Sequence, residues 1–170
     1  MDFMKLAKER YSCRKFSDKR VEKEMIDKII EAGRIAPTAV NRQPFKIFIM
    51  NSEHAKTMVR ENTTCTFNAD CFLIMGYKDD EGWIRKYDDK NFSEIDAVIA
   101  ATHMMLEIQD LGLATTWVGY FNEPKLKRNF PEMKDYKLIA IFPVGYAADD
   151  AIPSENHFKR KTTEMITEVL

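Results

Sequence analysis

Two short segments near the N-terminus carry the side chains best suited to bind a small molecule. In the first segment, two arginines and a serine stand on alternate residues, so in an extended backbone Arg10, Ser12 and Arg14 point to the same side. Guanidinium and hydroxyl donors gathered in this way suit a phosphate or another anion. Because surface arginine is common, the three residues alone are equally consistent with a solvated helix end.

The second segment is a loop bounded by Pro37 and Pro44. Its amide side chains, Asn41 and Gln43, offer directional hydrogen bonds to a planar heterocycle. Asparagine also forms turns without any ligand, so turn formation is the alternative role. Together the two segments suggest a site for a phosphorylated aromatic cofactor.

Length and composition predict one ordinary globular domain over residues 1–170. Apolar residues make up 45% of the chain, and the formal net charge of -1 gives no long-range attraction to nucleic acid or anionic membrane. The longest mainly apolar stretch, residues 97–106, is too short to span a bilayer, and the charged N-terminus does not resemble a signal peptide. We therefore expect a cytoplasmic protein with neither nucleic acid nor membrane as a partner.

The cysteines and histidines indicate neither a metal site nor a nucleophile. The three cysteines lack CxxC or Cys/His ligand spacing, which favours reduced thiols, two of them in or near the core. Cys13 lies inside the first segment, where a redox-sensitive thiol is conceivable. The histidines, which also lack the spacing of a metal motif or a catalytic triad, are His54, His103 and His157. We predict no metal ligand and no catalytic side chain.

Hydrophobic periodicity predicts helices and strands in a mixed α+β pattern around one sheet. The expected helices cover residues 2–10, 21–35, 52–62, 94–110 and 124–130. The expected strands cover residues 45–50, 71–75, 114–118 and 138–144. Asp2 and Ser52 are candidate N-caps, Ser93 and Asp96 have the spacing of a capping box, and Gly112 suits a helix end.

The expected helix over residues 94–110 is apolar around most of its circumference. One stripe consists of Ile95, Val98, Ile99, Thr102, Met105 and Leu106. The other side is nearly as apolar, with Ala97, Ala100, Ala101 and Met104. Such a helix is buried on more than one side, and one sheet of so small a domain covers only one of them. We therefore predict a homodimer that buries the remaining face.

The connection over residues 78–92 is long and places Trp83, Tyr87 and Phe92 among many charges. It is consistent either with a lid over a substrate or with a solvated helical excursion.

Four motifs in this order resemble those of the FMN-dependent nitroreductases, in particular their short single-domain members. They are the segments 10–16, 36–45, 111–119 and 142–146, with the sequences RYSCRKF, APTAVNRQPF, LGLATTWVG and FPVGY. The resemblance covers nearly the whole chain. It implies an α+β nitroreductase-like fold with a central, mostly antiparallel sheet flanked by helices, and an intertwined homodimer with flavin at the subunit boundary.

The resemblance also implies roles for individual residues. Arg10 and Ser12 would contact the phosphate and ribityl end of FMN, and Arg14 would lie near the pyrimidine edge of the ring, where its charge favours reduction. The loop of one subunit would wall the flavin of the other, through Pro37, Thr38, Ala39, Asn41 and Gln43.

Two later segments would complete the cofactor site. Main-chain groups of Thr116, Val118 and Gly119 would face flavin N5 and O4, where the small Gly119 permits a close approach. Near the C-terminus, Arg160 and Lys161 match the basic cluster at the phosphate, although the usual proline two positions after the arginine is Thr162 here.

The function implied by the resemblance is an FMN-dependent NAD(P)H oxidoreductase. NADH or NADPH would deliver hydride to FMN and leave, and an electron-poor acceptor such as a nitroaromatic or a quinone would then be reduced, in a ping-pong order. The alternatives are a flavin-dependent dehydrogenase or reductive dehalogenase of the same fold, and a non-catalytic FMN-binding protein.

Overall fold

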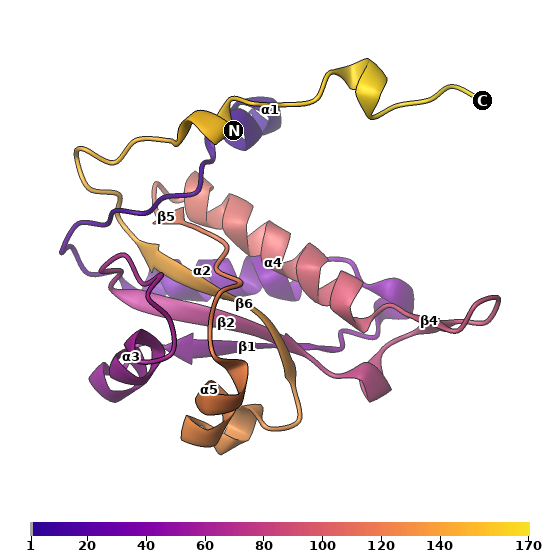
Figure 1. Cartoon of the computed structure of the whole chain (residues 1–170), viewed down its shortest axis with the longest axis horizontal. Coiled ribbons are helices and arrows are strands. Elements are labelled where there is room, and N and C mark those ends of the chain that lie inside the picture. The colour runs from indigo at the N-terminus through magenta and orange to yellow at the C-terminus, as the bar shows by residue number, and fades with distance from the viewer. Residues whose placement is uncertain (1) are drawn as a thin grey trace.

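The computed structural model describes residues 2–170 and contains a four-stranded antiparallel sheet with helices on both faces (Figure 1). The strands in spatial order are β1 (Phe45–Met50), β2 (Cys71–Tyr77), β6 (Lys137–Gly145) and β5 (Ala114–Thr115). All three pairings between these strands are antiparallel, and a parallel bridge joins Ser12 to Thr115. The predicted α+β fold with a mostly antiparallel sheet is confirmed.

Residues 2–170 contain five α-helices, each within two residues of the range that the periodicity predicts. They are α1 (Phe3–Glu9), α2 (Lys23–Arg34), α3 (Glu53–Arg60), α4 (Ser93–Asp110) and α5 (Glu123–Asn129). Four of them contact the sheet or one another beside it, and α1 packs against α4. No helix of residues 2–170 combines the length and the apolar character needed to cross a bilayer. The strand predicted over residues 114–118 is shorter in the structure, where β5 ends at Thr115. The chain separates from β6 there, and Val118 pairs with Ile141 of β6 only as an isolated bridge.

Strand β2 is buried along its whole length because helices cover both of its faces. Its alternate side chains divide between two apolar clusters. Leu73 and Met75 belong to the cluster that includes residues of α2 and α4, whereas Phe72 and Ile74 belong to the cluster with residues of α3, α5 and the N-terminal segment. The side chains of Cys13 and Phe16 are therefore buried on the face of the sheet opposite α4.

The predicted helix caps are present in the structure except at the N-terminus of α4. The side chains of Asp2 and Ser52 accept backbone N–H groups of α1 and α3, and Gly112 follows α4 with a φ of 73°. The capping box predicted at Ser93 is wrong: Ser93 is the first residue of α4, and its buried hydroxyl has no hydrogen-bond partner within residues 2–170. The carboxylate of Asp96 instead accepts the backbone N–H of Ala39 at 2.9 Å, a contact with a distant segment that local spacing does not encode.

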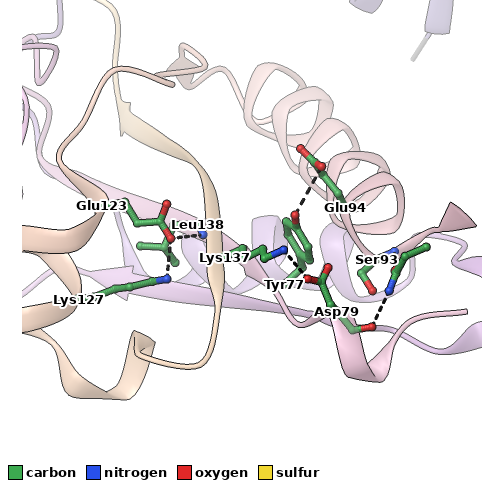
Figure 2. A network of polar contacts seen from close by, with 9 residues as sticks. Tyr77, Asp79, Ser93, Glu94, Glu123, Lys127, Lys137 and Leu138 are labelled. Carbon is green, nitrogen blue, oxygen red and sulfur yellow. Dashed lines mark hydrogen bonds and ion pairs between the residues drawn. The ribbon is translucent and has the colours of Figure 1, made fainter. Parts of the chain in front are cut away.

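Residues 78–92 contain a single 3-10 turn, Asp79–Glu81, followed by a β-hairpin of β3 (Ile84–Arg85) and β4 (Lys90–Asn91), so most of the segment is not the helical excursion that one alternative predicted. Figure 1 shows this hairpin projecting beyond the body of the molecule. Polar contacts fix its base: Lys137 pairs with Asp79, and the hydroxyl of Tyr77 donates to Glu94 at 3.5 Å (Figure 2). The lid role stays a prediction.

The cysteines are free, and two of them, Cys13 and Cys71, are buried, as predicted. Burial, together with the neighbouring carboxylate of Asp70, raises the pKa of Cys71 to about 12. The Cys13 thiol is fully buried and donates to the carbonyl of Lys15 at 3.1 Å. Neither thiol is therefore exposed for reaction in the folded chain.

We expect a thiol reagent at neutral pH to modify the partly exposed Cys65 first. The other two cysteines should react at least about tenfold more slowly, because thiolate formation and solvent access control the rate. Mass spectrometry of peptides from native and denatured protein checks this order. Early modification of Cys13 in the native protein would contradict it.

Candidate binding site for an anionic cofactor

Three arginine side chains converge on one pocket of about 220 Å³, formed where the two ends of the chain meet. Its lining consists of Arg10, Ser12, Arg14, Ser154, Asn156, His157 and Arg160. The structure thus brings together four of the residues that the sequence singles out, three from the N-terminal segment and one from the C-terminal segment.

The N-terminal segment presents its side chains through an extended backbone. Helix α1 ends before Arg10, which has φ -60° and ψ 124°, and Ser12 then pairs with Thr115 at the edge of the sheet. The backbone N–H of Cys13 donates to the carbonyl of Thr115 at 3.0 Å, while its side chain enters the core. Because side chains alternate along an extended chain, Ser12 and Arg14 lie on the opposite side, facing the pocket.

The C-terminal segment is held against this edge by contacts that follow β6. The backbone N–H of Ala148 donates to the carbonyl of Lys15 at 3.1 Å, and the side chain of Lys15 pairs with Asp150. Further on, the Arg160 guanidinium donates to the carbonyls of Asn156 at 3.3 Å and Lys159 at 3.0 Å.

Sequence reasoning missed three lining residues of this pocket, Ser154, Asn156 and His157. They lie in or beside a short 3-10 turn, Glu155–His157, three to six residues before Arg160. The only sequence signal that these three residues share is a polar side chain just before a basic cluster, and this signal alone does not indicate a binding site. Lys161, predicted as a second cation at the phosphate, does not line the pocket.

The pocket carries positive charge that no acidic side chain of residues 2–170 neutralises. No carboxylate lines it, and within residues 2–170 none of Arg10, Arg14 and Arg160 has an acidic partner at ion-pair distance. Burial lowers the pKa of Arg10, and the nearby charge of Arg160 lowers it further. An anion bound here relieves this repulsion and satisfies several guanidinium donors at once.

The Pro-bounded loop does not reach this pocket. Pro37, Thr38, Ala39, Asn41 and Gln43 lie beside the first turn of α4, where Ala39 contacts Asp96. Ser12 of the pocket instead pairs with Thr115, which follows the other end of that helix. An α-helix of 18 residues is about 27 Å long. The loop and the pocket of one chain therefore lie near opposite ends of this helix, and no residue of the loop lines the pocket.

Thr116, Val118 and Gly119 form a third group along β6. The N–H and C=O of Val118 both bond to Ile141, at 3.0 and 2.9 Å, so the N–H of Val118 is not free to donate to a ligand. Thr116 is buried, whereas Gly119 is exposed. A Cβ added at Gly119 would meet no atom within 4 Å, so the packing of this chain alone does not require glycine there.

A sequence model of the nitroreductase family matches residues 7–67 and 58–146. The chain belongs to the nitroreductase family. Among solved structures, a nitroreductase family protein from Clostridium difficile 630 is 34% identical with a TM-score of 0.89, over 99% of this chain and 98% of that one. An FMN-dependent nitroreductase from Clostridium difficile R20291 shares the fold at 20% identity, with a TM-score of 0.72 over 91% and 94% of the two chains.

Two curated relatives are longer than this chain. An iodotyrosine dehalogenase 1 homolog of Caenorhabditis elegans is 23% identical over 199 residues, which cover 98% of this chain and 61% of that protein. An NADPH-dependent oxidoreductase of Staphylococcus aureus (strain USA300) is 25% identical over 168 residues, which cover 89% and 65%. The chain thus spans less than two thirds of the length of either relative.

Proposed function

We propose that the protein is an FMN-dependent oxidoreductase that uses NADH or NADPH to reduce electron-poor acceptors such as nitroaromatics or quinones. The observation that carries the proposal is the pocket in which three guanidiniums converge without a carboxylate. The names of two relatives support it, since one is an FMN-dependent nitroreductase and another an NADPH-dependent oxidoreductase.

The pocket residues fit the phosphate of FMN. Hydrogen bonds to charged groups contribute about 1.5 to 3 kcal/mol each, so three or four around one phosphate suffice for tight retention. Arg10, Ser12 and Arg160 would hold the phosphate. Arg14, which the family resemblance assigns to the pyrimidine edge of the ring, lines the same pocket as these residues, so we propose that its charge lies beside the phosphate instead. When bound, FMN supplies the two-electron exchange between nicotinamide and acceptor, while the protein binds and orients the partners.

We further propose a homodimer in which the loop of one subunit completes the site of the other. The long separation between loop and pocket within one chain supports this arrangement. So does α4, whose inner face buries Ala97, Ala100, Ala101, Met104 and Ile108. Its outer face leaves Val98 37% exposed and Ile95, Ile99, Met105 and Leu106 partly exposed, an apolar surface suited to a second subunit.

The absorption spectrum of the purified protein tests the cofactor. We expect a yellow protein whose flavin bands bleach on addition of NADH or NADPH under argon. A colourless protein that shows no spectral or thermal shift with added FMN would refute the proposal. Stable bound FMN that neither nicotinamide bleaches would instead identify a non-catalytic FMN-binding protein.

Steady-state kinetics test the order of events and the acceptor. If both substrates use the same face of the flavin, double-reciprocal plots should be parallel, and intersecting lines would contradict the ping-pong order. Reductive dehalogenation is the second candidate, favoured by the relative that is named an iodotyrosine dehalogenase 1 homolog. An anaerobic acceptor panel with nitroaromatics, quinones and iodinated phenols separates the two, because only dehalogenation releases iodide.

A further inference from the structure

The Pro-bounded loop contains backbone strain that its own side chains do not explain. Val40 has φ 52° and ψ 25°, and Asn41 and Gln43 have φ values of 57° and 51°. The left-handed region is unfavourable for residues other than glycine, and most of all for a β-branched residue. Val40 is 72% exposed, so burial of its side chain does not offset the strain. Such strain persists only where surrounding contacts enforce it, and it concentrates at functional sites.

One contact with another element enforces the shape of this loop. The carboxylate oxygen Oδ1 of Asp96 accepts the backbone N–H of Ala39, directly before Val40, at 2.9 Å. Within residues 2–170 no other hydrogen bond joins residues 38–43 to a different element. Asp96 is only 1% exposed and lies in the first turns of α4, where the positive end of the helix favours a carboxylate.

Burying the carboxylate of Asp96 lowers the stability of the folded chain. Its other oxygen, Oδ2, is buried and has no hydrogen-bond partner among the described residues. A buried carboxylate with an unsatisfied oxygen is unfavourable unless its remaining contact is strong. The remaining contact of this carboxylate is the one to the loop.

Inside the loop, the amide side chains form a fixed pair. The Thr38 hydroxyl accepts the backbone N–H of Gln43 at 3.1 Å, and Nε2 of Gln43 donates to the carbonyl and side-chain oxygens of Asn41, each at 3.2 Å. This leaves Asn41 Nδ2 as a donor and Gln43 Oε1 as an acceptor for a ligand.

We infer that Asp96 is a positioning residue that holds this loop in its strained shape and thereby presents the Asn41 and Gln43 amides to the flavin. The identity of the ligand rests on the proposed function. The restraint of the loop by Asp96 does not rest on the proposed function, because it is a property of the chain without ligand.

Hydrogen exchange of the flavin-free protein tests the restraint. In Asp96→Ala, we expect exchange of a peptide covering residues 36–45 to accelerate at least about tenfold, because a hydrogen bond to a charged group is lost. Asp96→Asn keeps an acceptor at Oδ1 and should stay within about threefold of wild type. If Asp96→Ala does not fold, Asp96→Ser provides the same test, since its hydroxyl is too short to reach Ala39.

Asp70→Ala is the matched control. Asp70 also accepts a distant backbone N–H, that of Val21 at 2.9 Å, and it makes no contact with the loop. We expect this variant to lower the melting temperature without accelerating exchange of the loop peptide selectively. Unchanged loop exchange in Asp96→Ala, or equal acceleration in Asp70→Ala, would overturn the inference.

Two further measurements connect the restraint to strain and to the ligand. Val40→Gly removes the steric cost of the left-handed region, so the acceleration of loop exchange caused by Asp96→Ala should be smaller in that background.

FMN titration tests the link to the ligand. Asp96→Ala should bind FMN at least about tenfold more weakly than wild type, and Asp96→Asn should restore the affinity. A wild-type protein that binds no FMN would refute the proposed function, whereas the exchange experiment would still decide the role of Asp96.

Discussion

Replacing both Arg10 and Arg160 by alanine should weaken FMN binding at least about 100-fold while leaving riboflavin binding within about threefold of wild type. The two guanidiniums line one pocket without a carboxylate and come from opposite ends of the chain. Each charge-assisted hydrogen bond contributes about 1.5 to 3 kcal/mol, and about 1.4 kcal/mol corresponds to a tenfold change in affinity. Riboflavin lacks the phosphate, so the difference between the two ligands isolates that group. Quenching of flavin fluorescence measures both affinities.

The double substitution should not destabilise the protein without ligand. Burial is the main cause of the lowered pKa of Arg10, and repulsion between the Arg160 and Arg10 cations lowers it further. Removing both should therefore leave the melting temperature unchanged or slightly higher. Lys15→Ala is the control, because Lys15 lies in the same segment but is paired with Asp150 and does not line the pocket. Equal losses for FMN and riboflavin would show that this pocket does not hold the phosphate.

The fold could be predicted from the sequence because its signals are local. Helices such as α2 place apolar residues at helical spacing, and β2 is a continuous apolar run that both faces of the sheet then bury. The errors arose where a distant contact outweighs a local pattern. Ser93 and Asp96 have the spacing of a capping box, but the Asp96 carboxylate bonds to Ala39, which is 57 residues away.

The candidate site was only partly predictable for the same reason. Alternation along an extended segment places Ser12 and Arg14 on one side, and this needs no knowledge of the fold. Arg160 comes close to Arg10 because of the path that the chain takes after β6. Local sequence patterns do not encode that path, so only the family resemblance indicated that the two arginines share a site. His157 joins the pocket through the same return, and its residue type gave no reason to place it there.

Placing a charge on the outer face of α4 should separate the proposed dimer and abolish tight FMN binding with it. Val98 is 37% exposed in the single chain, so Val98→Glu changes a surface position of the subunit and should alter its own packing little. In a dimer that buries this face, the carboxylate would lose its hydration without a partner, a cost of several kcal/mol. The dissociation constant of the dimer should rise at least about 100-fold.

Analytical ultracentrifugation over a range of concentrations measures that change, and flavin titration of the same samples measures its consequence. Ile49→Glu is the matched control, because Ile49 is a β-branched residue that is 42% exposed on the edge strand β1, where it lines a pocket with residues of α2 and α3 and none of α4. It should leave association and FMN affinity unchanged. A monomeric Val98→Glu protein that binds FMN as tightly as wild type would show that one chain forms a complete site. The loop would then have no part in binding the flavin, because in a single chain it lies near the opposite end of α4 from the arginine pocket and none of its residues lines that pocket.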